Sequence, residues 1–236
     1  MSAGLIFRRV RDVRQRIANA AGGSSDGITL VAASKTMPAA LIREAIRAGV
    51  DAVGENRVQE MSEKDEQGAY DGAPLHFIGR LQKNKVSKVV GRVELIHSVD
   101  SLALAEAIDQ CAGRRGIIQP VLAQVNIAKE TTKGGFFPEN ILEALKSMSS
   151  LRYIRIRGLM CIPPPLDTQY FVVMRQLYID IQAKKVDNIG MDFLSMGMSD
   201  DFEWAVRAGA NMLRIGSSIF GERNRAAAGA GASHLI

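Results

Sequence analysis

Cysteine and histidine are scarce in this sequence of 236 residues, and the few that occur are widely separated. The two cysteines, Cys111 and Cys161, are too far apart for a CxxC redox pair or a zinc cluster, and two cysteines cannot build a disulfide framework. The three histidines, His76, His97 and His234, do not have the spacing of metal ligands. We therefore expect no bound metal, and the cytoplasm is the expected compartment.

Long hydrophobic runs and runs of one charge are also missing. No apolar stretch approaches the roughly 18 residues that span a bilayer, and Arg8 and Arg9 have no hydrophobic region behind them, so we expect neither secretion nor membrane insertion. The 30 basic and 25 acidic residues, which give a formal net charge of +5, are interspersed. We expect no nucleic-acid partner and interpret the charge as a solvated surface that also suits an anionic ligand.

The composition and patterning indicate a folded α/β protein. The sequence is 47% hydrophobic and 23% charged, and β-branched apolar runs alternate with helical periodicity throughout, as in repeated βαβ units. Its length matches the ~250 residues of a single closed (β/α)8 TIM barrel. Strands are predicted at 28–34, 52–54, 75–78, 93–97, 121–126, 156–160, 192–196 and 212–215. Helices are predicted at 39–48, 58–66, 83–90, 102–113, 138–148, 170–184 and 201–208, with an extra N-terminal helix at 5–20.

An open, doubly wound sheet is the alternative fold. It would usually show a glycine-rich fingerprint after the first strand, where this chain has Ser34, Lys35 and Thr36. No linker divides the chain, because its proline and glycine clusters are only loop-sized. We therefore predict one barrel domain at 1–225, followed by a flexible tail at 226–236 that is rich in alanine and glycine.

Lys35 is the first candidate functional residue. Active sites of such barrels lie at the carboxyl ends of the strands, and Lys35 directly follows the apolar run of the first strand. A lysine amine that is partly desolvated and near other cations becomes a nucleophile that can form a Schiff base with an aldehyde. The alternative is an ordinary solvated lysine on a βα loop.

The ends of the last two strands predict an anion site. Ser199 follows the seventh strand, and Gly216, Ser217 and Ser218 follow the eighth. Backbone N–H groups and hydroxyls from these two loops would converge on one phosphate, as in many barrels. The serines could instead be simple helix N-caps.

Arg214 alternates with apolar residues on the eighth strand and should point into the barrel. A buried arginine needs a partner. Arg214 would either hydrogen-bond a ring nitrogen of a ligand and keep it unprotonated, or form an internal salt bridge with Glu55.

Several motifs in order resemble the pyridoxal phosphate homeostasis protein family, and the match covers most of the chain. They are VAASKT at 31–36, GENRVQE at 54–60, HFIGRLQKNK at 76–85, KGG at 133–135, GLM at 158–160, SMGMSDD at 195–201 and RIGSSIFG at 214–221. The family is a group of single-domain fold-type III barrels similar to the alanine racemase N-terminal barrel. Leu75 and Thr132 depart from its pattern, which leaves open how the neighbouring loops close over the mouth.

The resemblance implies that Lys35 holds pyridoxal 5′-phosphate (PLP) as a Schiff base. It further implies that the cofactor's phosphate binds to Ser199, Gly216, Ser217 and Ser218. By analogy with alanine racemase, Arg214 would face the pyridine nitrogen and leave the ring a weaker electron sink. The residues implied to line the ring pocket are Asn56, His76 and Met160. Of these, His76 could equally be a structural histidine.

The implied role is non-enzymatic PLP binding that keeps the PLP supply, and with it amino-acid and keto-acid pools, in balance. We expect no catalytic residue, because fold-type III enzymes complete their site with a second domain for which this chain has no room. Cys161 is the only candidate acid/base near the mouth, and a buried structural thiol is the alternative. The alternative functions are a PLP-dependent racemase or lyase, and a cofactor-free barrel whose Lys35 forms Schiff bases with sugar-phosphate aldehydes.

Partners follow from the same resemblance. PLP-dependent apoenzymes would receive the cofactor, and Lys83, Lys85 and Lys133 would act as secondary acceptors, attract the phosphate, or simply form a solvated basic face. A monomer is expected, because no site completed across a dimer is required.

Overall fold

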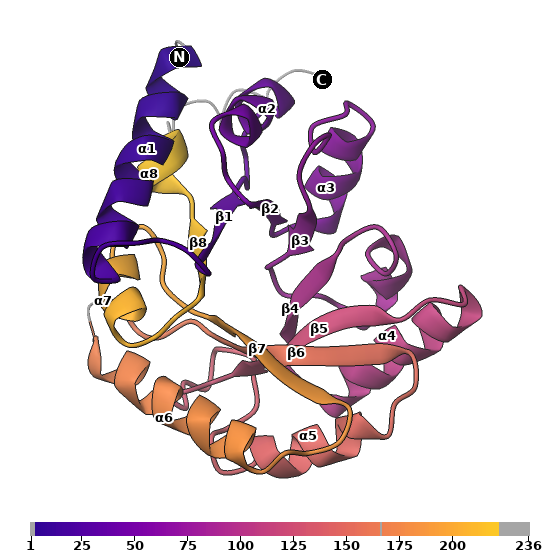
Figure 1. Ribbon diagram of the computed structural model, residues 1–236. Helices are drawn as coiled ribbons and strands as arrows, with labels where there is room; N and C mark the ends of the chain where they lie inside the picture. Colours follow the sequence, from indigo (N-terminus) through magenta and orange to yellow (C-terminus); the bar gives the residue numbers. More distant parts are fainter. Residues whose placement is uncertain (1–2, 166, 222–236) are drawn as a thin grey trace, which may run out of the picture.

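A computed structural model describes residues 3–165 and 167–221 of the chain. Eight parallel strands form a closed barrel in chain order, with β1 pairing with both β2 and β8 (Figure 1). The strands are β1 Thr29–Ala33, β2 Ala52–Glu55, β3 Leu75–Phe77, β4 Leu95–Val99, β5 Gln119–Val125, β6 Ile154–Cys161, β7 Ile189–Ser195 and β8 Met212–Ile215. The predicted (β/α)8 barrel is confirmed, and the open sheet is excluded. The tail predicted at 226–236, the domain end at 225 and His234 lie outside the described residues.

The helices surround the barrel. They are α1 Ala3–Ala20, α2 Ala39–Arg47, α3 Val58–Asp65, the 3₁₀ helix η1 Lys83–Lys88, α4 Leu102–Arg114, α5 Ile141–Ser149, α6 Gln169–Ala183, α7 Phe202–Arg207 and α8 Ser217–Phe220. The extra N-terminal helix, α1, packs against α2, α7 and α8, the elements on either side of the place where β1 meets β8 (Figure 1). It therefore covers the closing pair of strands.

One predicted helix, at 83–90, is instead a short 3₁₀ helix that ends at Lys88. Its β-branched valines are poor helix formers. The guanidinium of Arg115 also takes two of its carbonyl oxygens, donating to Ser87 O and Val90 O at 2.6 and 2.5 Å. Ser87 and Val90 lie in the last turn of the predicted helix, where carbonyls have no partner within a helix, and Arg115 satisfies them from outside.

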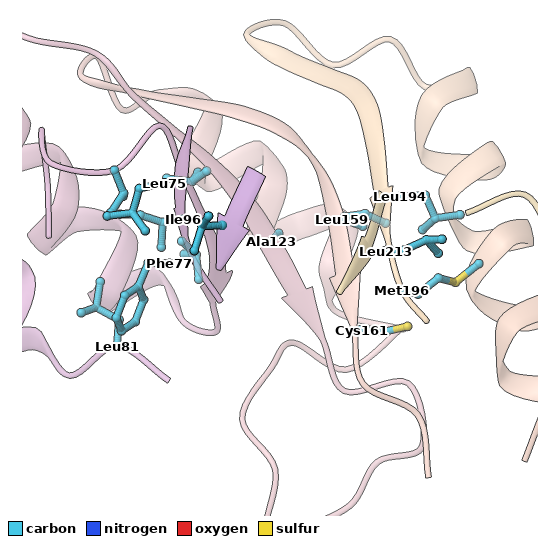
Figure 2. Close-up of a cluster of buried hydrophobic side chains, with 14 of the residues drawn as sticks. Leu75, Phe77, Leu81, Ile96, Ala123, Leu159, Cys161, Leu194, Met196 and Leu213 are labelled. Carbon is cyan, nitrogen blue, oxygen red and sulfur yellow. The ribbon is translucent and has the colours of Figure 1, made fainter. Parts of the chain in front are cut away.

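The core has two layers because successive strand residues point to opposite faces. The larger layer lies between the strands and the helices, and Figure 2 shows part of it, with Phe77 and Ile96 on one side and Leu194 and Leu213 on the other. The inner layer fills the barrel lumen. Its members are Val31, Ala52, Leu95, Leu122, Met160 and Met212. Buried polar side chains also point into this lumen, and they are described below.

In the described ranges, no helix is long and apolar enough to cross a membrane. Likewise, residues 3–165 and 167–221 contain no group of three or more His, Cys, Asp or Glu placed to hold a metal ion.

Candidate functional site at the carboxyl ends of the strands

A cavity of about 260 Å³ opens at the carboxyl ends of the strands. Residues at or just after the carboxyl ends of β2 to β6, together with the loop at 132–134, form its wall, as expected of a barrel of this type. They are Asn56, Ile78, Gly79, Arg80, Asp100, Gln124, Val125, Asn126, Thr132, Lys133, Gly134 and Ile162. Sequence reasoning missed Asp100 and Gln124. The predicted end of the fourth strand at residue 97 placed Asp100 too far along the chain to be recognised as a strand-end residue.

Lys35 follows β1 and is half-buried at this end of the barrel. The turn that carries it is fixed on both sides. Before it, Ser34 O accepts a hydrogen bond from Lys64 Nζ at 2.9 Å, and after it, Thr36 N donates to Glu60 Oε2 at 2.8 Å. Thr36 has a φ of 64°, a left-handed conformation that is unfavourable for a β-branched residue. The contacts from α3 therefore hold Lys35 in a turn that the chain would not adopt by itself.

Glu55, at the end of β2, supports the same turn from inside the protein. Its carboxylate is fully buried and accepts hydrogen bonds at Oε1 from Ser34 Oγ (2.6 Å), Lys64 Nζ (2.7 Å) and Tyr70 OH (3.1 Å). Burial, together with the adjacent Glu55, raises the pKa of Tyr70 far above its usual value. Glu55 is thus the partner of Lys64, and the predicted alternative of a Glu55–Arg214 salt bridge is wrong.

Asn56 lies one residue further along, at the wall of the mouth cavity. Its Oδ1 atom is buried and has no hydrogen-bond partner among the described residues. A buried polar atom without a partner is rare in a folded protein. It is an acceptor available to a ligand in the cavity.

Gly79 holds Asn56 in place by close approach. A Cβ at position 79 would lie 2.1 Å from Asn56 O and 2.6 Å from Asn56 Cα, both backbone atoms that cannot move aside. We expect Gly79→Ala to lower the free energy of unfolding by about 1–3 kcal/mol, as overpacking does elsewhere. Urea denaturation measures this, with Gly4→Ala as the control because position 4 is open space. Equal stability of the two variants would contradict the expectation.

The predicted anion site brings two loops together beside β1. Ser199 Oγ accepts hydrogen bonds from the backbone N–H groups of Gly216 and Ser218, both at 3.2 Å, and Ser218 Oγ donates to Ser199 O at 3.4 Å. Ser217 is exposed at the start of α8. All four residues predicted for phosphate binding are therefore neighbours, and in this structure the donors of Gly216 and Ser218 bind to Ser199.

The strands beneath these loops are joined by a short seam. β7 and β8 share one register pair, Ser195 with Met212. The side chain of Asn211 extends the seam: its Oδ1 accepts from Leu194 N at 2.7 Å and its Nδ2 donates to Asp192 O at 2.6 Å. At the start of β8, this side-chain amide thus adds to the backbone bonds between the two strands, which include Met196 N to Met212 O and Arg214 N to Gly197 O.

Arg214 points into the barrel, as predicted, and is only 4% exposed. Its Nη1 donates to Ser195 Oγ at 2.6 Å and its Nη2 donates to Cys161 O at 2.9 Å. Burial lowers its pKa from the usual value, although Cys161 and Asp201 act in the opposite direction. Met160 lies in the lumen layer, in register with Ser195 of the next strand.

His76 occupies a different place from the other predicted residues. It lies in the lumen and lines a second cavity, of about 280 Å³, whose wall includes residues at the amino-terminal ends of the strands, such as Thr29, Ala52 and Leu95. Its Nδ1 is 3.0 Å from Nε2 of His97. His76 does not line the mouth cavity, where Asn56 is the only one of the nine predicted site residues on the wall. The contact of His76 with His97 suits the alternative of a structural histidine.

Cys161 faces away from the lumen. Its thiol is fully buried in the outer core layer with Met196 and Leu213 (Figure 2), and burial raises its pKa to about 12. A thiol that stays protonated and points away from the mouth is not an acid/base for the site. None of the described tyrosines lines the mouth cavity.

Comparisons place this geometry among known barrels. The sequence profile of the family "Alanine racemase, N-terminal domain" matches residues 9–224. An alanine racemase of Clostridium difficile shares the fold, with a TM-score of 0.70 at 18% identity over 92% of this chain and 57% of that chain. The fold and the site therefore define a fold-type III barrel of the alanine racemase N-terminal type.

Similar sequences identify the family within this class. The pyridoxal phosphate homeostasis protein of Aquifex aeolicus is 42% identical over 228 residues, covering 94% of this chain and 99% of that protein. The protein of the same name from Escherichia coli is 40% identical over 225 residues, covering 92% and 94%. This chain belongs to the pyridoxal phosphate homeostasis protein family, as its motifs indicated.

One similar solved structure contains a ligand. PipY of Synechococcus elongatus, determined with PLP bound, has a TM-score of 0.77 at 36% identity, covering 89% of this chain and all of that one. The same protein determined without PLP has a TM-score of 0.82 over 92% of this chain.

Proposed function

We propose that this protein binds PLP at the carboxyl ends of its strands and acts in PLP homeostasis without catalysing a reaction of its own. The observation that carries the proposal is the closeness of Lys35 to the anion loops. β1 and β8 are paired, and a Cβ at Gly216 would lie 3.3 Å from Ala33 O, two residues before Lys35. An amine and an anion site side by side match the aldehyde and the phosphate of one PLP molecule.

The residues present fit the cofactor. The proposed binding set is Lys35, Asn56, Met160, Ser199, Arg214, Gly216, Ser217 and Ser218, with Lys35 as the Schiff-base lysine. When bound, PLP supplies an aldehyde for covalent capture and a ring that withdraws electrons in proportion to the charge on its nitrogen. Arg214 can only donate hydrogen bonds, so it favours an unprotonated ring nitrogen. The acceptor Asn56 Oδ1 supplies a partner for a polar group on the ring.

The lack of a thiol or a phenol among the described residues on the wall of the mouth cavity, the groups that commonly serve as acid/base in fold-type III enzymes, supports a binding role over turnover. Among the described residues, Cys161 points outward and the tyrosines lie elsewhere. We propose that the protein acts as a monomer in the cytoplasm, where its two buried free thiols stay reduced, and passes PLP to PLP-dependent apoenzymes. Lys83 and Lys85 are exposed, and Lys133 lines the mouth cavity. All three can attract the phosphate.

The test of PLP binding is a covalent-labelling experiment. PLP is added to the purified protein, the visible absorption spectrum is recorded, and borohydride reduction is followed by peptide mass analysis. We expect a yellow protein with the reduced adduct on Lys35, and complete loss of this adduct in Lys35→Ala. Lys146→Ala, which removes an exposed lysine of α5, is the control and should label like the wild type.

Two results would overturn the proposal or part of it. Labelling spread over surface lysines, with no loss in Lys35→Ala, would contradict a specific site. Solvent deuterium incorporation at the α-carbon of an amino acid, dependent on Lys35, would instead identify the alternative, a PLP-dependent racemase or lyase.

A further inference from the structure

Four polar side chains form a hydrogen-bonded row across the barrel lumen, from β3 to β8. His76 Nδ1 is 3.0 Å from His97 Nε2, His97 Nδ1 is 3.1 Å from Ser195 Oγ, and Ser195 Oγ is 2.6 Å from Arg214 Nη1. All four residues are buried, with exposures from 0% to 4%. The bond between His97 of β4 and Ser195 of β7 joins strands that are not neighbours in the sheet. The row therefore spans the lumen.

The direction of every hydrogen bond in the row follows from Arg214. A guanidinium has donors only, so Ser195 Oγ accepts from it. The hydroxyl hydrogen of Ser195 would be left unpaired in a dry interior unless it is donated to His97 Nδ1. A neutral imidazole with Nδ1 as acceptor carries its hydrogen on Nε2, which His97 then donates to His76 Nδ1. This is the arrangement in which the Ser195 hydroxyl hydrogen has an acceptor within the row, and both imidazoles are neutral in it.

Protonating either histidine would break this arrangement. A hydrogen on His97 Nδ1 would face the Ser195 hydroxyl hydrogen, and a hydrogen on His76 Nδ1 would face that of His97 Nε2. The pKa directions agree, because burial lowers the pKa of both imidazoles, and the nearby Arg214 cation acts further on His97. Asp201 and the Cys161 thiol are the other titratable groups that act on Arg214. The row therefore stays neutral apart from its guanidinium end.

We infer that Ser195 and His97 are positioning residues that hold the Arg214 guanidinium in one orientation toward the cofactor ring. The inference rests on the proposed PLP site. Arg214 has two fixed bonds, to Ser195 Oγ and to Cys161 O. Two bonds set the plane of a guanidinium, whereas one leaves it free to turn. The surrounding lumen side chains include Met160 and Met212, which are flexible and cannot fix it by shape.

The test uses Ser195→Ala, which removes one bond to Arg214 and little volume. Ser98→Ala is the matched control: Ser98 is a buried serine of β4 whose Oγ has no hydrogen-bond partner in the described structure. We expect PLP to bind about tenfold more weakly to Ser195→Ala, since a hydrogen bond to a charged group is lost. We also expect the visible band of bound PLP to change at a higher pH, because a displaced cation no longer suppresses protonation of the ring nitrogen.

Two variants of His97 extend the test. His97→Phe removes both hydrogen bonds of the imidazole and should act like Ser195→Ala, whereas His97→Gln keeps one acceptor and one donor and should restore much of the wild-type spectrum. Thermal unfolding of each PLP-free variant shows whether it is folded. A purely structural role would lower the melting temperature and leave the affinity and the band's pH dependence as in Ser98→Ala, which would overturn the inference.

The outcomes also separate this inference from the proposed function. If the wild-type protein forms no visible band with PLP, both the proposed function and this inference are overturned. If the wild type forms the band and Ser195→Ala matches both the wild type and Ser98→Ala, PLP binding stands and the inference alone is overturned.

Discussion

Lys64→Met is expected to lower the free energy of unfolding by about 3–5 kcal/mol, the usual cost of removing one partner from a buried ion pair. Lys64 Nζ lies 2.7 Å from Glu55 Oε1, and the Glu55 side chain is 0% exposed. Methionine has a similar length but no charge. The carboxylate would therefore remain in the interior without its cation, and the carbonyl of Ser34 would also lose a donor.

A double-mutant cycle tests the origin of this loss. Urea denaturation of Lys64→Met, Glu55→Gln and the double variant should show that the double variant is more stable than the sum of the single losses predicts, because it leaves no buried charge unpaired. Lys146→Met, which breaks an exposed ion pair with Glu143 at 2.8 Å, should cost at most about 0.5 kcal/mol. Similar losses at positions 64 and 146 would show that the Glu55–Lys64 pair is not critical.

Acidification is expected to destabilise the protein well above the pH range in which carboxylates titrate. The folded-state pKa of His76 is lowered to about 4 by burial, and that of His97 is also well below its usual value. The unfolded chain, with histidine pKa values near ~6.5, therefore binds more protons below that pH. The contribution of these groups is complete above about pH 6.5 and is lost as the pH falls toward the folded-state values. His76 alone should cost about 2 kcal/mol between about pH 7 and pH 5.

The measurement is the free energy of unfolding from urea curves across this interval. His76→Gln removes one titrating group and should flatten the slope. Asp201 works the other way: burial raises its pKa, so it favours the folded state as the pH falls. A stability that is flat from pH 7 to pH 5, or a slope that His76→Gln leaves unchanged, would show that the two histidines are not held neutral.

Local patterning accounts for most of the site that the sequence predicted. Gly216 directly follows β8, Lys35 lies two residues past β1 and Ser199 lies four residues past β7. These strand ends can be read from residues close by in the chain. A barrel then gathers all such ends at one face. The positions of these residues therefore needed only the strands and the topology.

What the sequence could not show depends on contacts between distant strands. His97 and Ser195 are 98 residues apart in the chain, and only the closure and register of the barrel bring them together. Glu55 could pair with Arg214 or with Lys64 by charge alone, and the side of the strand on which each lies decides the partner. His76 is polar and follows an apolar residue, but how far down the lumen it sits depends on the stagger of all eight strands.

The short seam between β7 and β8 has a consequence for the motions of the barrel. A closed sheet opens most easily where the fewest hydrogen bonds join its strands. β7 and β8 share one register pair, fewer than any other two neighbouring strands, and their loops meet at Ser199 on one side and Gly216 and Ser218 on the other. In the proposed PLP site, a phosphate bound to both loops would join these two strands. Occupancy of that site would then be coupled to local opening of the barrel, and release of the ligand would loosen the sheet at this pair of strands.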